Sequence, residues 1–433
     1  MKKKGPTQEL LDQTRNLMSR GREVLAYGGL HSPIEDVLEY PGGALPQFVT
    51  HAKGCRIFDT CGQSYVDWFI GWGPMLLGYH HPEVDEAIIE QVRKGHNVSL
   101  MHPLEVEVAE QLKEMVPCAE KIAFGKNGSD VTCAAVRVAR AITGRDGILS
   151  CGYHGFHDWY QALNPDCRGV PQVLKSEIAS FPYNNLEALE DLLSRHHERI
   201  AAVIMEPTHD ILPAPGYLEG VRELTRRFNV LLIFDEVVTG FRLAPGGAQE
   251  LYGVIPDLAC LGKALSNGLP LSALAGKAEY MSILPAVSFG ITFRGEALSL
   301  AAAHACLKIF KRDPITKRLA ETGEKVRASF HKTCAKWDLP WKLSGHPSRM
   351  NFHYSGGGRI SAEGAKTLFF QECLKGGMLT RGVMLASYAL DEEAVALTTK
   401  TLDQAMKTVS RALKSGRLEK FLHFPPAPHF YEA

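Results

Sequence analysis

Short runs of apolar residues alternate with amphipathic segments through the middle of the chain. The runs AAVIM (201–205), VLLIF (230–234) and LACL (258–261) are apolar throughout, as expected of strands that are covered on both faces. Between the first two runs, YLEGVRELTRRFN has the spacing of an amphipathic helix. This order of strand, helix and strand predicts a mostly parallel α/β sheet.

Two longer helices are predicted before these strands. In EVDEAIIEQVRKG, the residues Val84, Ile88 and Val92 fall on one helical face. In DVTCAAVRVARAITG, apolar residues recur at helical spacing through positions 131–142, and Gly144 is suited to end the helix. Both segments therefore have the pattern of helices that cover one face of a sheet.

The two ends of the chain have a more mixed pattern. Residues 1–70 contain an amphipathic helix, glycine-rich loops and the predicted hairpin CRIFDTCGQSYVDW. After about residue 315 the pattern is again α+β, with a long helix near residues 402–415. We therefore expect an α/β protein with a large domain at residues 71–315. A smaller α+β domain is expected from both chain ends, residues 1–70 and 316–433.

Composition narrows the classes of function. Of the 433 residues, 45% are apolar, which is enough for two ordered domains. The 48 basic and 48 acidic residues cancel and form no basic block, so we expect no nucleic-acid partner. Polar sequence follows the basic start MKKK, and no apolar run approaches the roughly 18 residues of a membrane span, so we expect no membrane partner. Ten scattered cysteines without CxxC spacing suit reduced thiols in the cytoplasm, and no metal site is expected.

An ionisable residue follows each of the three apolar runs. Glu206 follows AAVIM, Asp235 follows VLLIF, and Lys263 comes two residues after LACL. Strand ends are also where a chain returns to water, and Glu236, the second acid of the pair, is interpreted in that way. In open α/β sheets, however, ligands bind beyond the carboxyl ends of the strands. The three residues together favour a ligand site.

A pyridoxal phosphate (PLP) reaction uses this combination of side chains. A lysine forms an imine with the cofactor's aldehyde, and a buried carboxylate keeps the pyridine nitrogen protonated so that the ring can accept electrons. Lys263 and Asp235 suit those two tasks.

The sequence also offers a phosphate site and a ring-stacking residue. Asn127, Gly128 and Ser129 immediately precede a long helix, whose first backbone N–H groups can bind a phosphate. The same three residues are also suited to a simple turn and helix cap. Tyr153, in CGYHGFHDW, lies beside a glycine turn, where it either stacks on a pyridine ring or belongs to an ordinary loop.

A series of motifs resembles the class III, fold type I PLP aminotransferases, and among them the glutamate-1-semialdehyde 2,1-aminomutases. The motifs occur in the family's order over nearly the whole chain. They are GGLHSP, GWGPMLLGYHHP, FGKNGSD, RVARAITGRDGI, YHGFHDW, MEP, FDEVVTGFR, PDLACLGKALSNGLP and TFRGEALSLAAA. The resemblance implies the family's fold, with a smaller domain built from both chain ends.

The resemblance also implies roles for individual residues. Lys263 would form the imine and then move protons, Asp235 would pair with the ring nitrogen, and Val237 would pack on the ring face opposite Tyr153. Thr292 would reach the phosphate of a neighbouring subunit, which implies a homodimer. The implied catalytic residues are Lys263, Asp235 and Tyr153. The implied cofactor-binding residues are Asn127, Gly128, Ser129, Tyr153, His154, Glu206, Asp235, Val237, Lys263 and Thr292, and the substrate-binding residues are Ser32, Glu35, Trp72 and Arg294.

Two departures from the family's motifs concern the pocket. Where the aminomutases have an arginine that binds the substrate carboxylate, this chain has Glu35, which would repel a carboxylate. Where the family has NSGTEA, this chain reads KNGSDV, with Lys126 and Asn127 substituted next to the phosphate site. The motifs SNGLPLSALAG and FRGEALSLAAA are more similar to class III enzymes of amino-sugar, polysaccharide and secondary-metabolite pathways.

Three functions follow as hypotheses. The first is an aminotransferase that moves an amino group from a donor, with glutamate expected, to a carbonyl acceptor such as a sugar, cyclitol or secondary-metabolite intermediate. The second is an intramolecular aminomutase, for which residues 163–177 form a candidate lid. The third is a binding protein that keeps the fold without catalysis, against which the intact Asp235 and Lys263 argue. For the donor carboxylate, Arg242, Arg294, Arg349 and Arg381 are candidates, with Arg294 preferred.

Overall fold

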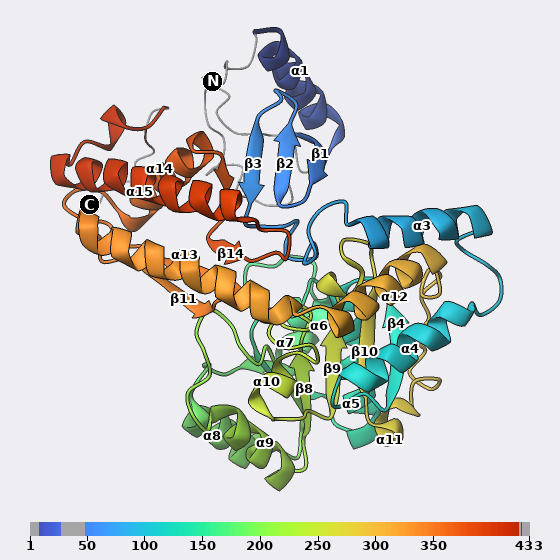
Figure 1. The fold of residues 1–433 in the computed structure, drawn as a ribbon. Helices are drawn as coiled ribbons and strands as arrows, with labels where there is room; N and C mark the ends of the chain where they lie inside the picture. The colour runs from blue at the N-terminus through green and yellow to red at the C-terminus, as the bar shows by residue number, and fades with distance from the viewer. Residues whose placement is uncertain (1–7, 27–47, 424–425, 427–433) are drawn as a thin grey trace. The chain divides into compact units, whose positions relative to one another are not determined.

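The computed structural model describes residues 8–26, 48–423 and 426, and these form two compact units (Figure 1). The core unit comprises residues 71–76 and 81–318. The terminal unit comprises the described parts of residues 1–70, 77–80 and 319–433.

The core unit is built on a seven-stranded sheet with the order β4-β10-β9-β8-β7-β5-β6. β10 runs antiparallel to both of its neighbours, and the pairs from β9 to β6 are parallel. The strands are β4 (Lys121–Gly125), β5 (Gly147–Cys151), β6 (Ile178–Ser180), β7 (Ile200–Met205), β8 (Leu231–Asp235), β9 (Leu258–Leu261) and β10 (Ser272–Gly276). The three apolar runs of the sequence therefore form adjacent parallel strands, as predicted.

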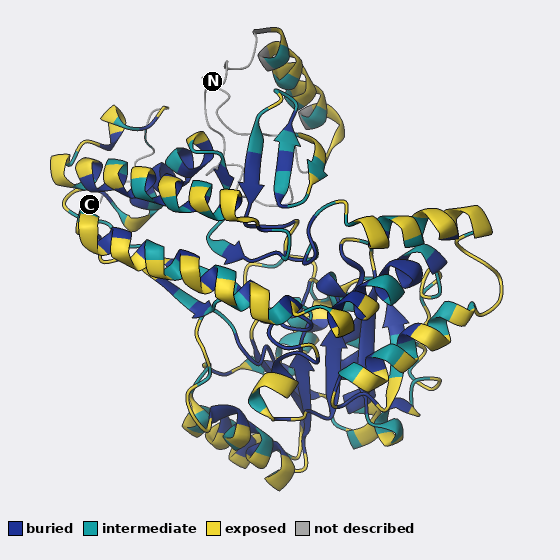
Figure 2. Cartoon of the chain, viewed as in Figure 1, coloured by how far each residue is buried: buried dark blue, intermediate teal, exposed yellow. Residues whose placement is uncertain are grey.

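Helices cover both faces of this sheet. They are α3 (Pro82–Lys94), α4 (Pro103–Met115), α5 (Gly128–Thr143), α6 (Asp158–Gln161), α7 (Gln172–Lys175), α8 (Leu186–His196), α9 (Tyr217–Arg227), α10 (Ala248–Tyr252), α11 (Ala278–Met281) and α12 (Ala297–Arg312), with a 3-10 turn η1 (Lys263–Ser266). Figure 2 shows β8, β9 and β10 buried, whereas α3, α8 and α9 have exposed outer surfaces. Side chains of β5, β7 and β8 are divided between two separate cores.

The alternation along β8 shows how the two cores are divided. Ile233 packs with α5 and α6, whereas Leu232 and Phe234 pack with α8 and α9. Side chains along a strand point to opposite faces with a period of two residues. The Asp235 side chain therefore lies on the α5 side of the sheet, and the Glu236 side chain lies on the opposite side.

α3 departs from the predicted apolar face. Val84 is buried, but Val92 is 54% exposed, and the neighbouring Gln91 is buried instead. The Gln91 side chain donates a hydrogen bond of 2.7 Å to the carbonyl oxygen of Gly95, which satisfies its amide inside the packing. The prediction that Val92 shares the covered face is wrong, because Gln91 and not Val92 occupies the buried side of this turn.

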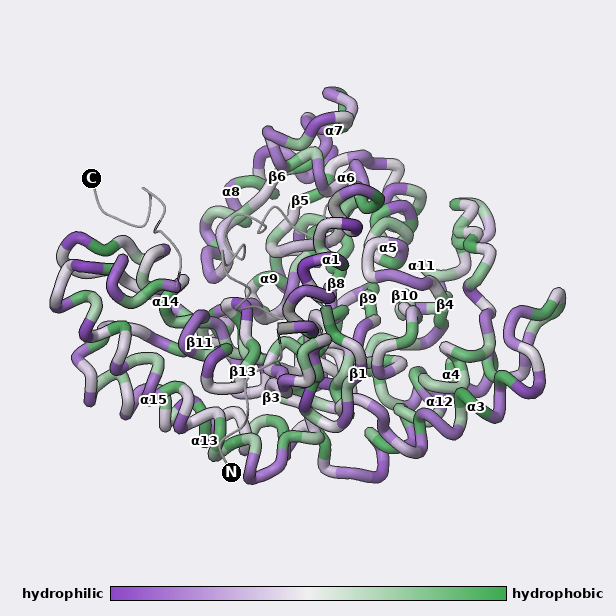
Figure 3. Tube along the Cα trace, turned by 90° about the horizontal axis from the view of Figure 1, so that it is seen from above, coloured by the Kyte–Doolittle hydropathy of each residue, from purple (hydrophilic) through white to green (hydrophobic). Residues whose placement is uncertain are grey.

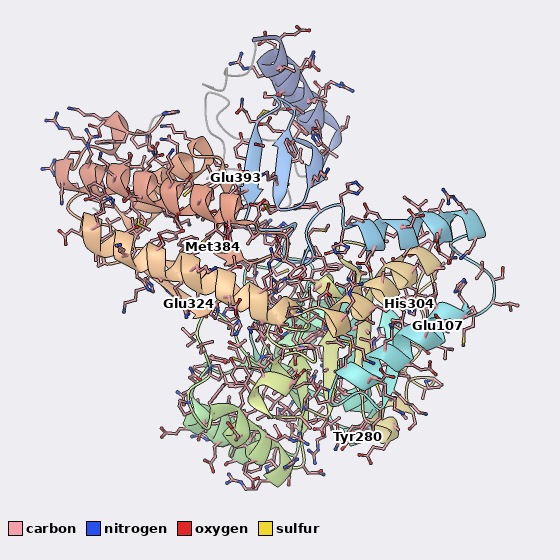
Figure 4. The ribbon with its side chains drawn as sticks, in the orientation of Figure 1. Glu107, Tyr280, His304, Glu324, Met384 and Glu393 are labelled. Atoms are coloured by element: carbon pink, nitrogen blue, oxygen red, sulfur yellow. The ribbon has the colours of Figure 1, made fainter. Side chains whose placement is uncertain are left out.

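α12 packs against α3 and α4. Figure 4 shows His304 of α12 near Glu107 of α4, with 3.7 Å between His304 Nε2 and a Glu107 carboxylate oxygen. His304 Nδ1 lies 3.0 Å from the side-chain oxygen of Gln111, also on α4. Polar contacts therefore fix α12, which follows the segment that contains Thr292.

The terminal unit contains two smaller sheets, with the orders β1-β2-β3-β13 and β11-β12-β14. The strands are β1 (Val49–Lys53), β2 (Arg56–Asp59), β3 (Ser64–Asp67), β11 (Lys342–His346), β12 (Arg349–His353), β13 (Met378–Leu379) and β14 (Val383–Leu385). The helices are α1 (Gln8–Val24), α13 (Ile315–Trp337, in this unit from Leu319), α14 (Ala362–Lys375), α15 (Glu392–Ser415) and the 3-10 turn η2 (Leu418–Lys420). β2 and β3 are antiparallel, which confirms the predicted hairpin.

α15 is longer than the sequence predicts. It begins at Glu392, ten residues before the expected start at 402 (402 − 392 = 10), because the Asp391 side chain caps it by accepting a hydrogen bond of 2.7 Å from Ala394 N–H. In Figure 3 the tube of α15 alternates between hydrophilic and hydrophobic positions, as expected of a helix with one covered face. No helix in the described part of the chain is both long and apolar enough to cross a membrane.

A buried ion pair connects α9 to the sheet of the core unit. The Arg222 guanidinium binds both carboxylate oxygens of Asp257, at 2.7 and 2.8 Å, and Leu232 N–H donates to the same carboxylate. Burial raises the pKa of Asp257, but the hydrogen bonds from Arg222 and Leu232 outweigh burial and hold the pKa below its ordinary value of 3.8. The Asp257 carboxylate is therefore ionised in the folded protein at every pH at which it is ionised in the unfolded chain.

We predict that Asp257→Asn destabilises the protein at neutral pH by about 3 kcal/mol, because it leaves the buried Arg222 without its counter-charge. Since the folded pKa lies below the unfolded one, this contribution is present above pH 3.8 and is lost as the pH falls further. Urea unfolding at pH 7 and pH 3 measures it. An equal difference between wild type and variant at both pH values would contradict the prediction.

Candidate active site

Three strand ends meet at one edge of the core sheet. Asp235, the last residue of β8, is aligned with Cys260 of β9, and Lys263 comes three residues later (263 − 260 = 3). On the other side, the last residue of β7 is aligned with the residue before Asp235, so Glu206 is level with Asp235. The three ionisable residues that the sequence singled out therefore lie along one edge.

Two further segments reach this edge. The last residues of β5 and β7 are aligned, so Tyr153 and His154 follow β5 beside Glu206. β4 ends at Gly125, which is aligned with Ser272 of β10, and α5 begins three residues after Gly125 (128 − 125 = 3). The phosphate-binding candidates and the ring-stacking candidate are thus placed at the same edge as the ionisable residues.

Asp235 is held in one orientation by two donors. It is 5% exposed, and its carboxylate oxygens lie 2.8 Å from His154 Nδ1 and 3.1 Å from Val237 N–H. His154 is 2% exposed, and its Nε2 has no hydrogen-bond partner among the described residues. A carboxylate held in this way can stabilise a positive charge placed beside it, such as a protonated ring nitrogen.

Glu236 is not a strand end returning to water, and that interpretation is wrong. Its side chain is fully buried and accepts hydrogen bonds from Thr239 Oγ1 at 2.5 Å and from the N–H groups of Ala248 and Gln249 at 2.7 and 2.9 Å. Burial raises its pKa, and these donors partly offset that effect. Glu236 therefore fixes the start of α10 on the sheet face opposite Asp235.

The start of α5 forms a tight cradle. A side-chain carbon at Gly128 would lie 3.0 Å from Val237 Cγ1, and one at Gly155 would collide with the Ser129 hydroxyl. Ser129 Oγ accepts a hydrogen bond of 3.3 Å from Phe156 N–H. The first N–H groups of a helix have no partner within it, so those of Gly128 and Ser129 are suited to an anion such as a phosphate.

Lys263 occupies a strained position. It is partly buried and begins η1 with a φ of 44°, although a non-glycine residue rarely takes a positive φ. Such a conformation costs on the order of 1–3 kcal/mol and persists only where the surroundings enforce it. Because strained backbone conformations are concentrated at functional sites, the strain supports a functional role for Lys263.

Glu206 lies between β7 and the Tyr153 loop. It is 6% exposed, and one of its oxygens accepts a hydrogen bond of 3.0 Å from Tyr153 N–H and lies 3.5 Å from His209 Nε2. Tyr153 itself is 62% exposed, and its ring meets Tyr160 edge to face at 5.5 Å. Glu206 thus holds the backbone of the Tyr153 loop.

Tyr160 is a site residue that the sequence reasoning missed. Burial, together with the charges of Glu206 and Asp235, raises its pKa to about 12. Its hydroxyl donates a hydrogen bond of 2.9 Å to the carbonyl oxygen of Gly152. Its place one residue past CGYHGFHDW is the only sequence signal for it.

The predicted substrate-binding residues differ in how exposed they are and in the unit to which they belong. Trp72 is 48% exposed with a φ of 69°, and the carbonyl oxygen of the next residue, Gly73, accepts a hydrogen bond of 2.6 Å from Arg242. Arg242 is fully buried, which argues against its candidacy for the donor carboxylate, whereas Arg294 is exposed. Arg349 and Arg381 belong to the terminal unit.

The remaining predicted features are Thr292, the candidate lid, and the substrate-binding candidates Ser32 and Glu35. Thr292 is exposed, in residues 292–296, which directly precede α12 and are called the Thr292 segment below. The candidate lid at residues 163–177 contains the short helix α7 within loop structure. Ser32 and Glu35 lie outside the described residues.

With this geometry established, comparison with known proteins decides the family. The sequence matches the family described as aminotransferase class-III over residues 40–341. The chain belongs to the class III aminotransferases. It is therefore a PLP-dependent enzyme, and the earlier expectations of this cofactor and family are confirmed.

Individual class III relatives carry two kinds of name. The 3-aminobutyryl-CoA aminotransferase of Cloacimonas acidaminovorans is 39% identical over 347 residues, which cover 78% of this chain and 82% of the relative. The glutamate-1-semialdehyde 2,1-aminomutase of Methanothermobacter thermautotrophicus is 37% identical over 392 residues, which cover 86% and 91%. The structure of the FumI protein of Sphingopyxis sp. MTA144, solved in a form that carries PLP, is 29% identical with a TM-score of 0.87, covering 93% of this chain and 98% of that one. The predicted fold type I architecture is confirmed.

The edge of the core sheet fits the cofactor of the class III aminotransferases. Asp235 and His154 offer a buried acceptor for a ring N–H, the start of α5 offers N–H donors for a phosphate, and Lys263 offers an amine. The glycines of the cradle leave no space for a side chain between them and Val237 or Ser129. These residues would hold the ring, the phosphate and the aldehyde carbon, respectively.

We predict that Gly128→Ala weakens PLP binding by about tenfold, because the added methyl pushes Val237 toward the volume of the ring and overpacking costs about 1–3 kcal/mol. Equilibrium binding of PLP to the apoprotein, followed by absorbance, measures the change. Gly357→Ala is the matched control, since its nearest neighbour would lie 3.9 Å away. Equal affinities for the two variants would show that the contact with Val237 does not shape the site.

Proposed function

We propose that the chain is an aminotransferase that takes an amino group from a small-molecule donor, with glutamate expected, and transfers it to a small-molecule carbonyl acceptor. The observation that supports this most is the pairing of a buried carboxylate, Asp235, with His154 at the sheet edge that also carries Lys263. The cradle at Gly128 and Ser129, at the same edge, supports it further.

The residues divide the work by their positions. When bound, PLP supplies an electron-accepting ring that stabilises negative charge on the substrate carbon that bears nitrogen. Asp235, oriented by His154, keeps the proton on the ring nitrogen. The Lys263 amine takes the proton from the substrate carbon in one half reaction and returns a proton in the other. Val237 and Tyr153 would flank the ring, and Glu206 holds the loop of Tyr153 through a hydrogen bond from Tyr153 N–H.

Two residues, Arg294 and Glu35, carry the proposal for substrate binding. Arg242 is committed to the carbonyl oxygens of Gly73 and Val238, so Arg294 is the better candidate for the carboxylate of the donor. The motifs favour a sugar, cyclitol or secondary-metabolite carbonyl as the acceptor, and Glu35 fits an acceptor that lacks a carboxylate. Aminomutase activity is the second candidate, because several relatives have that name.

We further propose that the protein is a homodimer in the cytoplasm. The core unit exposes several large apolar side chains near the Thr292 segment and the start of α4. They are Val98, Leu100, Met101, Val106 and Phe293, exposed by 46%, 84%, 72%, 50% and 55%. Such a concentration of exposed apolar side chains is typical of an interaction surface. The ten free cysteines are consistent with a reducing compartment.

The spectrum of the bound cofactor tests the aminotransferase proposal. We predict that purified protein is yellow, that amino donors bleach the visible absorbance of the bound aldehyde form, and that acceptors restore it. Lys263→Ala should bind PLP without covalent attachment and lose more than about a thousandfold in rate. Conversion of glutamate-1-semialdehyde to 5-aminolevulinate without any added donor would replace the proposal with the aminomutase. A protein that stays colourless with added PLP would exclude both.

We predict that the wild type sediments as a dimer and that Leu100→Glu, a charge placed on an 84% exposed apolar residue, converts it largely to monomer. Val24→Glu on α1, at a residue that is 79% exposed, is the matched control and should leave the dimer intact. Sedimentation velocity distinguishes the two states. Dissociation by the Val24 change alone would assign the dimer contact to a different surface.

A further inference from the structure

A nearly buried ion pair joins the start of α5 to the start of α12. The Lys126 ammonium lies 3.1 Å from a carboxylate oxygen of Glu296 and 3.4 Å from the hydroxyl of Ser299. The side chains of Lys126 and Glu296 are only 10% and 14% exposed. Lys126 is also one of the two positions where this chain departs from its family's motif beside the phosphate site.

The lysine end of the pair belongs to the phosphate cradle. The Lys126 and Asn127 N–H groups donate hydrogen bonds of 2.9 and 2.7 Å to the same oxygen of Asp130, in the first turn of α5. The backbone at Lys126 is therefore fixed to the helix whose first N–H groups would bind a phosphate. Movement of the Lys126 side chain would be transmitted to Gly128 two residues later.

The glutamate end belongs to the Thr292 segment. Glu296 caps α12 by accepting hydrogen bonds from Leu298 N–H and Ser299 N–H at 2.6 and 3.2 Å, and its own N–H donates to the carbonyl oxygen of Phe293. Glu296 comes four residues after Thr292 in the chain (296 − 292 = 4). The carboxylate therefore anchors the end of the segment that carries Thr292.

The pair is specific in geometry as well as charge. Burial raises the pKa of Glu296, but its hydrogen bond from Ser299 at 2.6 Å and its contact with Lys126 outweigh burial and lower the pKa. Removal of Glu296 would take the counter-charge from the nearly buried Lys126 ammonium. Removal of Lys126 would take it from the Glu296 carboxylate, which would keep its hydrogen bonds from Ser299. The start of α5 and the Thr292 segment are thus held in one relative position.

We propose that the Lys126–Glu296 pair is a positioning device that couples phosphate binding in one subunit to the placement of the Thr292 segment, and hence to dimer stability. The inference rests on the proposed homodimer in which Thr292 reaches the partner's phosphate. A phosphate in the cradle orders the start of α5, and the ion pair passes that order to the segment at the subunit contact. Because binding coupling is reciprocal, dimer formation should tighten phosphate binding by the same factor.

The test uses Lys126→Met, Glu296→Gln and the double variant. The control is Lys311→Met with Glu114→Gln, which removes another ion pair of α12 that is 2.6 Å long but 68% and 60% exposed. PLP and pyridoxal, which lacks the phosphate, are titrated into the apoprotein. Dimer dissociation constants are measured by sedimentation with and without PLP, and circular dichroism verifies the fold of each variant.

For the wild type we expect PLP to tighten the dimer by at least about tenfold, within the range usual for coupled sites. In each single variant this tightening should fall below about threefold, and PLP affinity should fall about tenfold while pyridoxal affinity changes less than about twofold. The double variant should be no worse than the single ones, as expected for one shared interaction. The control pair should behave as the wild type.

Two results would overturn the coupling. One is an unchanged effect of PLP on the dimer in both single variants, and the other is an equal loss of PLP and pyridoxal affinity, which indicates a general structural defect. A wild type that binds PLP as a monomer would instead overturn the homodimer proposal and the coupling that rests on it. The outcome for the wild type therefore distinguishes the two failures.

Discussion

The two-residue alternation of side chains along buried strands is the constraint on which the site depends. In β8 it directs Ile233 and Asp235 to the α5 side of the sheet and Glu236 to the opposite side. The two adjacent carboxylates consequently have different environments. Asp235 meets His154, whereas Glu236 is surrounded by donors from Thr239 and the start of α10. A one-residue shift in the register of β8 would exchange them and leave the site without its ring partner.

The same side of the sheet is packed around the cradle without spare volume. A side-chain carbon at Gly128 would press on Val237, and one at Gly155 would collide with Ser129. The residues proposed to flank the ring and those proposed to hold the phosphate are therefore placed close against one another. Phe156 N–H adds a hydrogen bond to the Ser129 hydroxyl. A substitution at either glycine would therefore disturb both groups of residues together.

The sequence predicts the central part of the fold well because β7, β8 and β9 are covered on both faces, which makes them short and wholly apolar. For the same reason it predicts that Glu206, Asp235 and Lys263 share one edge. It does not predict what depends on distant partners. Arg242 bonds to Gly73, 169 residues away, and no local pattern reveals that contact. The burial of Gln91 in place of Val92 likewise follows from helix packing and not from hydrophobic periodicity.

Arg242 stabilises the core unit, and this role separates stability from substrate recognition. Its guanidinium donates hydrogen bonds inside the core unit to the carbonyl oxygens of Val238 and Gly73. Gly73 follows Trp72, whose backbone has a left-handed conformation. A charged substrate group would therefore be met by other side chains at the rim of the site, such as the exposed Arg294. Rim residues tolerate replacement without loss of packing, so substrate preference can diverge among descendants of one ancestor while the catalytic framework is inherited unchanged.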